Sequence, residues 1–196
     1  TWSFNPAGKK DELFGRPGDV TMGTVAVPAL YLVKGAKLYG NDEALQAAYK
    51  GVRALAEFTK PAGAGPWELA NSQPDMLAVV LGTKAALDLY DYTGDEEILN
   101  IAVRIATQGL PFIYFREVPR TVQSLYTTIA SFGSTNWHRP WQGSPVQWQG
   151  MFLSDMYKRL DEYDDTLDWG KIGQGMANAG INLVNNERWP GRFPDY

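Results

Sequence analysis

The chain has 196 residues, of which 44% are apolar, 20% charged and 13% aromatic. This composition is typical of a folded globular protein and excludes a disordered or collagen-like chain. Because the chain has no Cys, it also excludes disulfides, Cys-ligated metal centres and thiol nucleophiles. Eighteen basic against 22 acidic residues give a net charge of -4, so we expect no nucleic-acid partner. A neutral or weakly charged ligand suits this charge balance better.

No run of about 18 apolar residues is present, so we expect no membrane-spanning helix and no membrane partner. The sequence starts with Thr, without a basic-then-apolar leader, so we expect a processed chain or a piece of a longer one. Seven Trp, ten Tyr and 20 Gly stand beside a single His. The placement of the Trp residues is therefore central to a functional interpretation.

A repeat with a period of about 50 residues organises the chain. Residues 37–45, Lys-Leu-Tyr-Gly-Asn-Asp-Glu-Ala-Leu, return as residues 88–99, Asp-Leu-Tyr-Asp-Tyr-Thr-Gly-Asp-Glu-Glu-Ile-Leu. In each copy an apolar segment with helical spacing ends near a Gly, and an acidic cap starts a second helical segment. The pattern predicts helical hairpins with tight turns.

The first predicted hairpin covers residues 28–58, with helices over Ala29–Tyr39 and Asp42–Phe58. Their apolar residues recur at three- and four-residue steps, as one face of a helix requires. Asn41 is the natural N-cap of the second helix. Pro28 either starts the first helix or kinks it.

The second predicted hairpin covers residues 74–108, with helices over Pro74–Tyr92 and Asp95–Gln108. Ser72 is expected as the N-cap of the first helix, with Pro at the first helical position and Asp75 at the third. In the link that follows, Phe112-Ile-Tyr-Phe115 suits a short strand, and Thr121–Phe132 suits a strand or a helix.

The third predicted hairpin covers residues 145–184 and fits the repeat less closely. Its helices are expected over Met151–Tyr163 and Leu167–Val184, after a capping arrangement at Ser144-Pro-Val-Gln147. Asp164-Asp-Thr-Leu-Asp168 matches the Asp-rich pattern that binds magnesium and diphosphate in isoprenoid synthases. Because it falls between two helices of a hairpin, we predict a turn there, with Asp165 or Thr166 as cap.

The links between hairpins, residues 59–73 and 109–144, are long and rich in Gly, Pro and Trp, whereas the turns within hairpins are short. Because all hairpins point the same way, the long links must lie together, beside the starts of the first helices of the pairs. We call this surface the long-link face and expect the functional site there. The sequence thus predicts an all-α protein, with one helical-hairpin domain over residues 1–196.

Side chains suited to sugar binding fall on the long-link face. Indole rings stack on the CH-rich faces of sugars, while short polar groups bind the hydroxyls. Each Trp alone suits a helical core equally well, but clustering with Gln and Arg favours a binding site. The candidate sugar-binding residues are Trp67, Trp137, His138, Arg139, Trp141, Gln142, Gln147 and Trp148.

Three carboxylates on the same face are candidates for catalysis. Glycoside hydrolysis without a metal or cofactor requires two carboxyl groups, one as general acid and one as base or nucleophile. Glu68, beside Trp67 in a Gly- and Pro-rich loop, has the weakest structural alternative and is the preferred acid. The structural alternative for Asp75 is a capping box, and that for Asp19 is a simple N-cap.

The single His limits other chemistries. A Ser-His-Asp hydrolase would have to use His138, but no Gly-x-Ser-x-Gly elbow occurs. A metal site made of several His residues is excluded. His138 or a Tyr suits a polysaccharide lyase, in which Arg139 neutralises a uronate and the base removes the proton beside its carboxylate.

The two turn motifs, Leu-Tyr-Gly-Asn-Asp-Glu-Ala-Leu and Tyr-Thr-Gly-Asp-Glu-Glu-Ile-Leu, joined by Trp-rich links, resemble the six-hairpin glycosidase superfamily, the (α/α) toroids of bacterial carbohydrate-degrading enzymes. The likeness covers residues 30–110 well and 145–185 loosely, and the scaffold is shared by hydrolases, lyases and epimerases. It implies a cleft where the inner helices begin and favours a periplasmic or secreted location. Three hairpins would make about half a ring, so the resemblance implies a partner: the rest of the toroid or a homo-oligomer.

The leading hypothesis is a glycoside hydrolase acting on a poly- or oligosaccharide, with Glu68 and either Asp19 or Asp75 as the acid and base. The alternatives are a non-catalytic helical-repeat or glycan-binding module that uses the same Trp residues, and the lyase.

Overall fold

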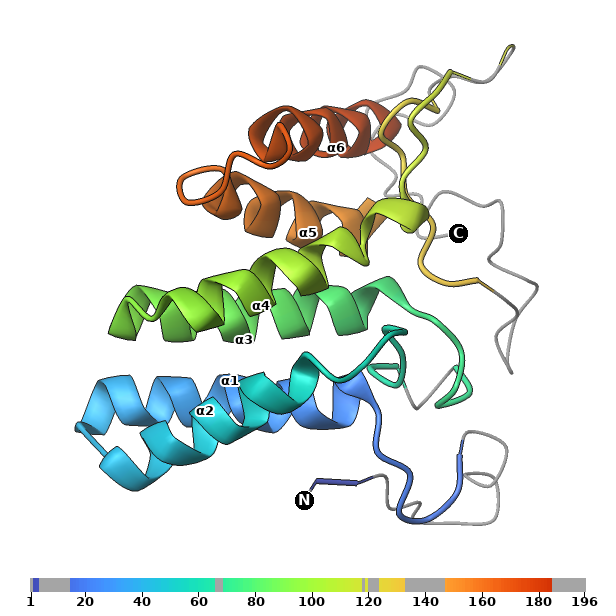
Figure 1. Ribbon diagram of the computed structural model, residues 1–196. Coiled ribbons are helices and arrows are strands. Elements are labelled where there is room, and N and C mark those ends of the chain that lie inside the picture. Colours follow the sequence, from blue (N-terminus) through green and yellow to red (C-terminus); the bar gives the residue numbers. More distant parts are fainter. Residues whose placement is uncertain are drawn as a thin grey trace.

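The structure is a computed structural model, and it describes residues 2–3, 15–65, 69–117, 119, 124–132 and 147–184. Within these residues it contains six α-helices and no β-strand, which confirms the all-α class. The helices form three antiparallel pairs that stack one on the next (Figure 1).

The three helix pairs lie where the repeat predicts hairpins. Their bounds are α1 Met22–Tyr39 and α2 Asp42–Leu55, α3 Met76–Thr93 and α4 Glu96–Thr107, and α5 Gln147–Leu160 and α6 Trp169–Val184. A short 3-10 helix, η2 (Leu110–Phe112), follows α4 in place of the predicted strand. Residues 124–132 are irregular and form isolated bridges with other segments, such as that of Ile113 with Thr128.

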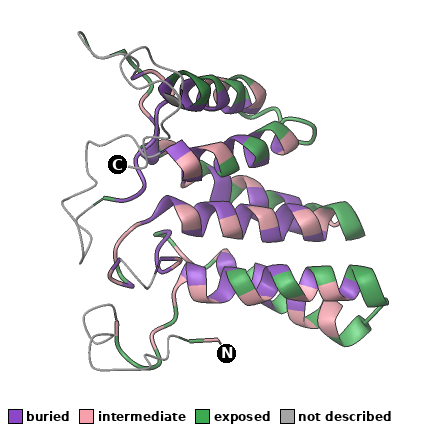
Figure 2. Cartoon of the chain, turned by 180° about the vertical axis from the view of Figure 1, so that it is seen from behind, coloured by how far each residue is buried: buried purple, intermediate pink, exposed green. Residues whose placement is uncertain are grey.

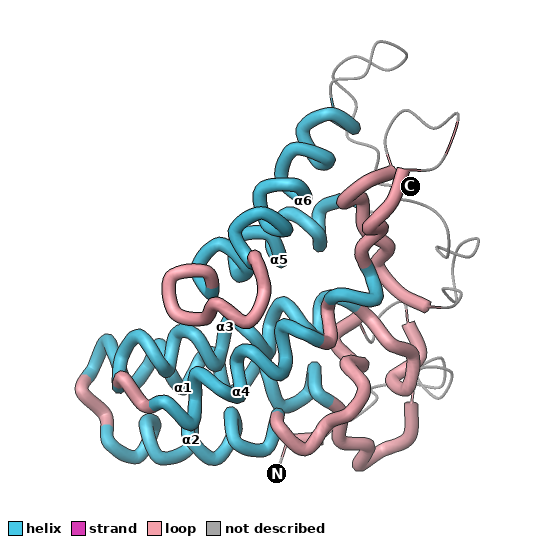
Figure 3. The backbone as a smooth tube through the Cα atoms, turned by 45° about the horizontal axis from the view of Figure 1, so that its top comes forward, coloured by secondary structure: helices cyan, strands magenta, loops and turns pink. Residues whose placement is uncertain are grey.

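The first helices of the pairs pack against one another in the order α1, α3, α5, and each is also covered by its own partner helix. The short turns lie at one end of the stack and the long links gather at the other (Figures 1 and 3). This arrangement confirms that the described parts of the links share one face.

The core runs along the stack where the hairpins meet, and exposed residues gather at the short turns (Figure 2). Trp169 at the start of α6 is fully buried, and its ring lies 5.0 Å from that of Tyr157 on α5. The Tyr157 hydroxyl donates to the carbonyl of Ala106 (3.0 Å), which ties α5 to the end of α4. Trp169 therefore serves the core and contributes nothing to an aromatic binding surface.

The short turns are closed by glycines in the left-handed region. Gly40 (φ 60°) ends α1 and Gly94 (φ 68°) ends α3, a conformation that residues with a Cβ rarely adopt. The side chain of Asn41 accepts the N–H of Ala44 (2.9 Å) at the start of α2, as predicted.

Four helix starts differ from the predictions by two residues or more. Helix α5 begins at Gln147 instead of Met151, and α6 begins at Trp169 instead of Leu167. The starts of α1 and α3 also differ. Helix α1 begins at Met22 after Thr21, whose side chain forms a capping box with Thr24, so Pro28 lies inside the helix. Helix α3 begins at Met76 with Asp75 as its N-cap, so the predicted Ser72 cap is wrong. The predicted start fails because Pro74 pairs with Ala62 in a bridge, which holds this segment extended.

The Asp-rich segment forms a turn and a cap, as predicted, although the capping residue differs. Asp168, rather than Asp165 or Thr166, accepts the N–H of Lys171 (3.0 Å) at the start of α6. Asp164 accepts the indole N–H of the buried Trp169. These carboxylates are therefore engaged in local structure.

A cluster of charges joins α3 to α5 near the short turns. The Arg159 guanidinium contacts Asp88 Oδ1 (2.9 Å) and Asp91 Oδ2 (2.7 Å), and the Tyr163 hydroxyl donates to Asp91 Oδ1 (3.0 Å). The Arg159 side chain is only 24% exposed. Hydrogen bonds to charged groups in such partly buried positions are stronger than those on the open surface.

We predict that Arg159→Leu lowers the free energy of unfolding by about 1–3 kcal/mol, because it leaves Asp91 without a cation and Asp88 with Lys84 alone. Arg53→Leu is the matched control, since Arg53 makes an exposed ion pair with Glu97 between α2 and α4. Urea denaturation of both variants should show the larger loss for Arg159→Leu. Equal losses would contradict the structural role of the cluster.

Candidate functional site

Backbone hydrogen bonds tie the links together at the long-link face. The N–H of Gly23 at the start of α1 donates to Ala62 O (2.9 Å). The N–H of Asp75 donates to Pro61 O (3.0 Å), and that of Met76 donates to Ala130 O (2.8 Å). The starts of α1 and α3 and residues 130–131 of the second link are thus held in one network.

Asp75 lies at the centre of this network and has no exposed surface. Its Oδ1 accepts the N–H of Ala78 (2.8 Å), and its Oδ2 accepts the N–H of Ala64 (3.1 Å). Burial raises the pKa of the Asp75 carboxyl, while its backbone hydrogen bonds act to lower it. The geometry gives Asp75 a structural role and lends no support to its predicted catalytic one.

The first link passes so close to α1 that two glycines are required. A Cβ on Gly23 would lie 2.3 Å from the carbonyl carbon of Gly63. Gly63 itself has φ +81°, and a Cβ there would collide with the Thr21 side chain. Neither position accepts a larger residue without movement of the backbone.

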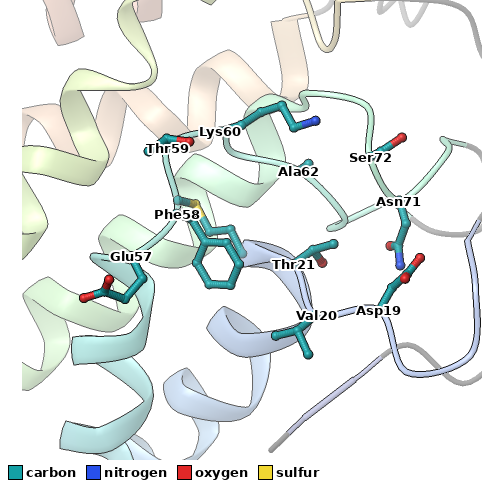
Figure 4. A pocket seen from close by; sticks show the side chains of 11 residues that line it. Asp19, Val20, Thr21, Glu57, Phe58, Thr59, Lys60, Ala62, Asn71 and Ser72 are labelled. Atoms are coloured by element: carbon teal, nitrogen blue, oxygen red, sulfur yellow. The ribbon is translucent and has the colours of Figure 1, made fainter.

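A cavity of about 400 Å³ opens beside this contact (Figure 4). It lies between the segment that enters α1, the residues that follow α2, and both described ends of the first link. This volume falls within the range of small-molecule sites, about 300–1,000 Å³. Among the described residues, the polar and aromatic side chains that line it are Asp19, Thr21, Glu57, Phe58, Thr59, Lys60, Asn71 and Ser72.

Asp19 is held at the edge of the cavity by a tight turn. Its N–H donates to Arg16 O (3.1 Å) across Pro17 and Gly18, and Gly18 has φ +90°. The N–H of Arg16 donates back to Asp19 Oδ2 (2.8 Å). Asp19 is therefore not the N-cap of α1, which is Thr21. Its partly exposed carboxylate faces the cavity.

Asn71 is a cavity residue that the sequence analysis missed. It is 2% exposed, and neither Oδ1 nor Nδ2 has a hydrogen-bond partner. Figure 4 shows its side chain directed toward Asp19. Nothing in the sequence distinguishes Asn71 from the other Asn residues, because burial without a partner is a property of the fold.

Two predicted sugar-binding residues lie at the start of α5, and neither lines this cavity. Gln147 is 2% exposed and its amide has no hydrogen-bond partner. Trp148 is half-buried, packs against Ala130, and meets Phe152 edge-on with ring centres 6.2 Å apart. The structure thus places Gln147 and Trp148 on the long-link face but apart from the cavity that contains Asp19.

The remaining site predictions fall outside the described residues and stay predictions. They concern the general acid Glu68 and the sugar-binding residues Trp67, Trp137, His138, Arg139, Trp141 and Gln142.

Within the described part of the chain, no group of three or more His, Asp or Glu side chains is placed to hold a metal ion. None of the described helices is both long and apolar enough to cross a bilayer.

Comparisons with protein-family models and with curated proteins find no match to this chain.

We predict that Asp75→Ala lowers the free energy of unfolding by about 2–4 kcal/mol, because it removes the cap of α3 and leaves the N–H of Ala64 unpaired. Asn41→Ala, which removes the exposed cap of α2, is the control and should cost about 1 kcal/mol. Chemical denaturation measures both variants. A loss for Asp75→Ala no greater than that for Asn41→Ala would contradict the central role of this carboxylate.

Asp75 should also make stability depend on pH. Because its pKa in the folded protein is raised above the ordinary 3.8, the folded state binds this proton more tightly than the unfolded chain. The free energy of unfolding of the wild type should therefore fall as the pH rises from about 4 through the raised pKa. Asp75→Asn should lack this component, and denaturation at a series of pH values measures the difference. A difference that does not vary with pH would refute the prediction.

Proposed function

We propose that the chain is a carbohydrate-active domain, most simply a glycoside hydrolase, built as part of an (α/α) toroid. The observation that carries the proposal is the cavity at the long-link face, which combines Asp19, three hydroxyl-bearing side chains and the ring of Phe58. Carboxylates and hydroxyls bind sugar hydroxyl groups, and an aromatic ring stacks on the CH-rich face of the sugar.

Asp19 and Glu68 are the proposed catalytic pair. Asp19 Oδ2 accepts the N–H of Arg16, and Oδ1 accepts no hydrogen bond from the described residues, so this oxygen is available to act on water or on the anomeric carbon. Glu68 belongs to the same link as the cavity residues Asn71 and Ser72, and it would protonate the glycosidic oxygen. Asp75 takes no part in this scheme, because both its oxygens are occupied by backbone N–H groups.

A non-catalytic glycan-binding module is the second proposal. The structural role of Asp75 favours this proposal. Of the two candidate carboxylates that the structure describes, only Asp19 is then left for catalysis, and hydrolysis needs two. The same cavity would then bind a sugar without cleaving it.

The proposed toroid needs further structure at the two ends of the stack. On α1, the side chains of Tyr31 and Leu38 are 65% and 74% exposed, and Phe152 on α5 is 55% exposed. The remainder of a ring, or a second copy of the chain, would cover such side chains.

The test is a screen of pooled polysaccharides, with reducing ends and the ultraviolet absorbance of unsaturated products followed in parallel. We expect new reducing ends without unsaturated products, and a loss of turnover of about 10²–10⁴-fold in Glu68→Gln and in Asp19→Asn. Asp155→Asn, an exposed change on α5, is the control and should retain activity.

Turnover that survives both substitutions would exclude this pair of catalytic residues. Unsaturated products would replace the hydrolase with a lyase. Saturable sugar binding without any turnover would favour the glycan-binding module.

A further inference from the structure

The amide of Asn71 is an unusual polar group because it combines burial, the lack of a partner and a place in the lining of the cavity. It is buried beside a cavity, yet neither its donor nor its acceptor atom is paired. An unpaired buried polar group costs about 1–3 kcal/mol, so such a group is retained where it serves another purpose.

Asn71 has little freedom to find another partner. A Cβ on Gly15 would lie 2.9 Å from both its Cβ and its Nδ2, and a Cβ on Gly63 would lie 3.0 Å from its Oδ1. Two stretches of backbone thus flank the amide, and its side chain is directed toward Asp19 (Figure 4). The unpaired donor and the free Oδ1 of Asp19 therefore lie at the same edge of the cavity.

The charge at the Asn71 edge of the cavity disfavours acidic ligands. Asp19 is the carboxylate beside Asn71, whereas the charged groups of Glu57 and Lys60 lie away from it (Figure 4). A uronate would bring a further negative charge toward the Asp19 carboxylate, which raises the cost of binding it. A neutral sugar has no such penalty.

We infer that the cavity binds a neutral sugar through Asp19, with Asn71 as the positioning residue of that carboxylate. On binding, Asn71 Nδ2–H donates to one oxygen of Asp19, and the other oxygen accepts a sugar hydroxyl. The buried amide thereby gains the partner that it lacks in the empty cavity. This inference rests on the proposed carbohydrate function and specifies its ligand and a residue that sequence analysis did not identify.

The first test separates a positioning role from a structural one. Asn71→Leu has nearly the same shape but no polar atoms, so it removes a buried group that is already unpaired. Its midpoint of urea unfolding should equal or exceed that of the wild type, while its affinity for a neutral hexose should fall about tenfold. A lower midpoint would show that the amide supports the fold and would overturn the inference.

The second test asks whether Asn71 acts through Asp19. Binding of glucose, mannose and galactose is measured by calorimetry for the wild type, Asp19→Asn, Asn71→Leu and the double variant. Because Asn71 acts on the carboxylate, Asn71→Leu should cost about tenfold in affinity in the wild type and little in the Asp19→Asn background. Ser72→Ala, an adjacent change in the same cavity, is the control, and its effect should be the same in both backgrounds. Independent losses for Asn71→Leu and Asp19→Asn would overturn the positioning role.

Glucuronate and galacturonate serve as the charged counterparts of glucose and galactose in the same measurement. At least one neutral hexose should bind at least tenfold more tightly than its uronate. Equal or tighter binding of the uronate, or no binding of any hexose, would overturn the inference. Even then, the proposed function would be supported if the protein hydrolyses a polysaccharide and Glu68→Gln abolishes this activity.

Discussion

The buried carboxylate of Asp75 is the interaction on which the long-link face depends. It begins α3, and through Ala64 it holds the first link against the start of that helix, while the N–H of Gly23 in α1 donates to Ala62 O of the same link. The backbone around it extends the same network, because Asp75 pairs with Ser131 and its N–H donates to Pro61 O. One ionisable group thus joins the start of α3 to the first link, which in turn contacts the start of α1. Its desolvation is offset by backbone hydrogen bonds rather than by a cation.

The repeat predicts the all-α architecture well because the start and end of each helix depend mainly on neighbouring residues. Helical spacing, acidic caps and the glycines after α1 and α3 are set by residues close together in sequence, and the hairpins follow from them. The predicted start of α3 at Pro74 is two residues too early, because it depends on contacts between residues far apart in the sequence. Pro74 and Asp75 are held extended by partners in the first link and at Ser131, and no local signal reports such long-range pairing.

The candidate site is predicted less completely than the fold. The sequence predicts the long-link face and places Asp19 on it, because the length of a link and the start of a helix can both be read from the order of residues. It does not separate a Trp of the core from a Trp of the surface, and Trp169 proves to be core. Nor does the sequence predict Asn71 as a site residue, because what distinguishes Asn71 is a buried amide without a hydrogen-bond partner. Both properties depend on what surrounds a side chain in space.

The two ends of the helical stack are held by different kinds of interaction. Near the short turns, Arg159 joins α3 to α5 through partly exposed charges, which dissolved salt screens. At the other end, the links are joined by backbone hydrogen bonds and by a buried carboxylate that ions reach poorly. Dissolved salt therefore weakens contacts at the short-turn end more than it weakens those around the cavity. The two ends of one helical stack thus respond differently to the same change of solvent.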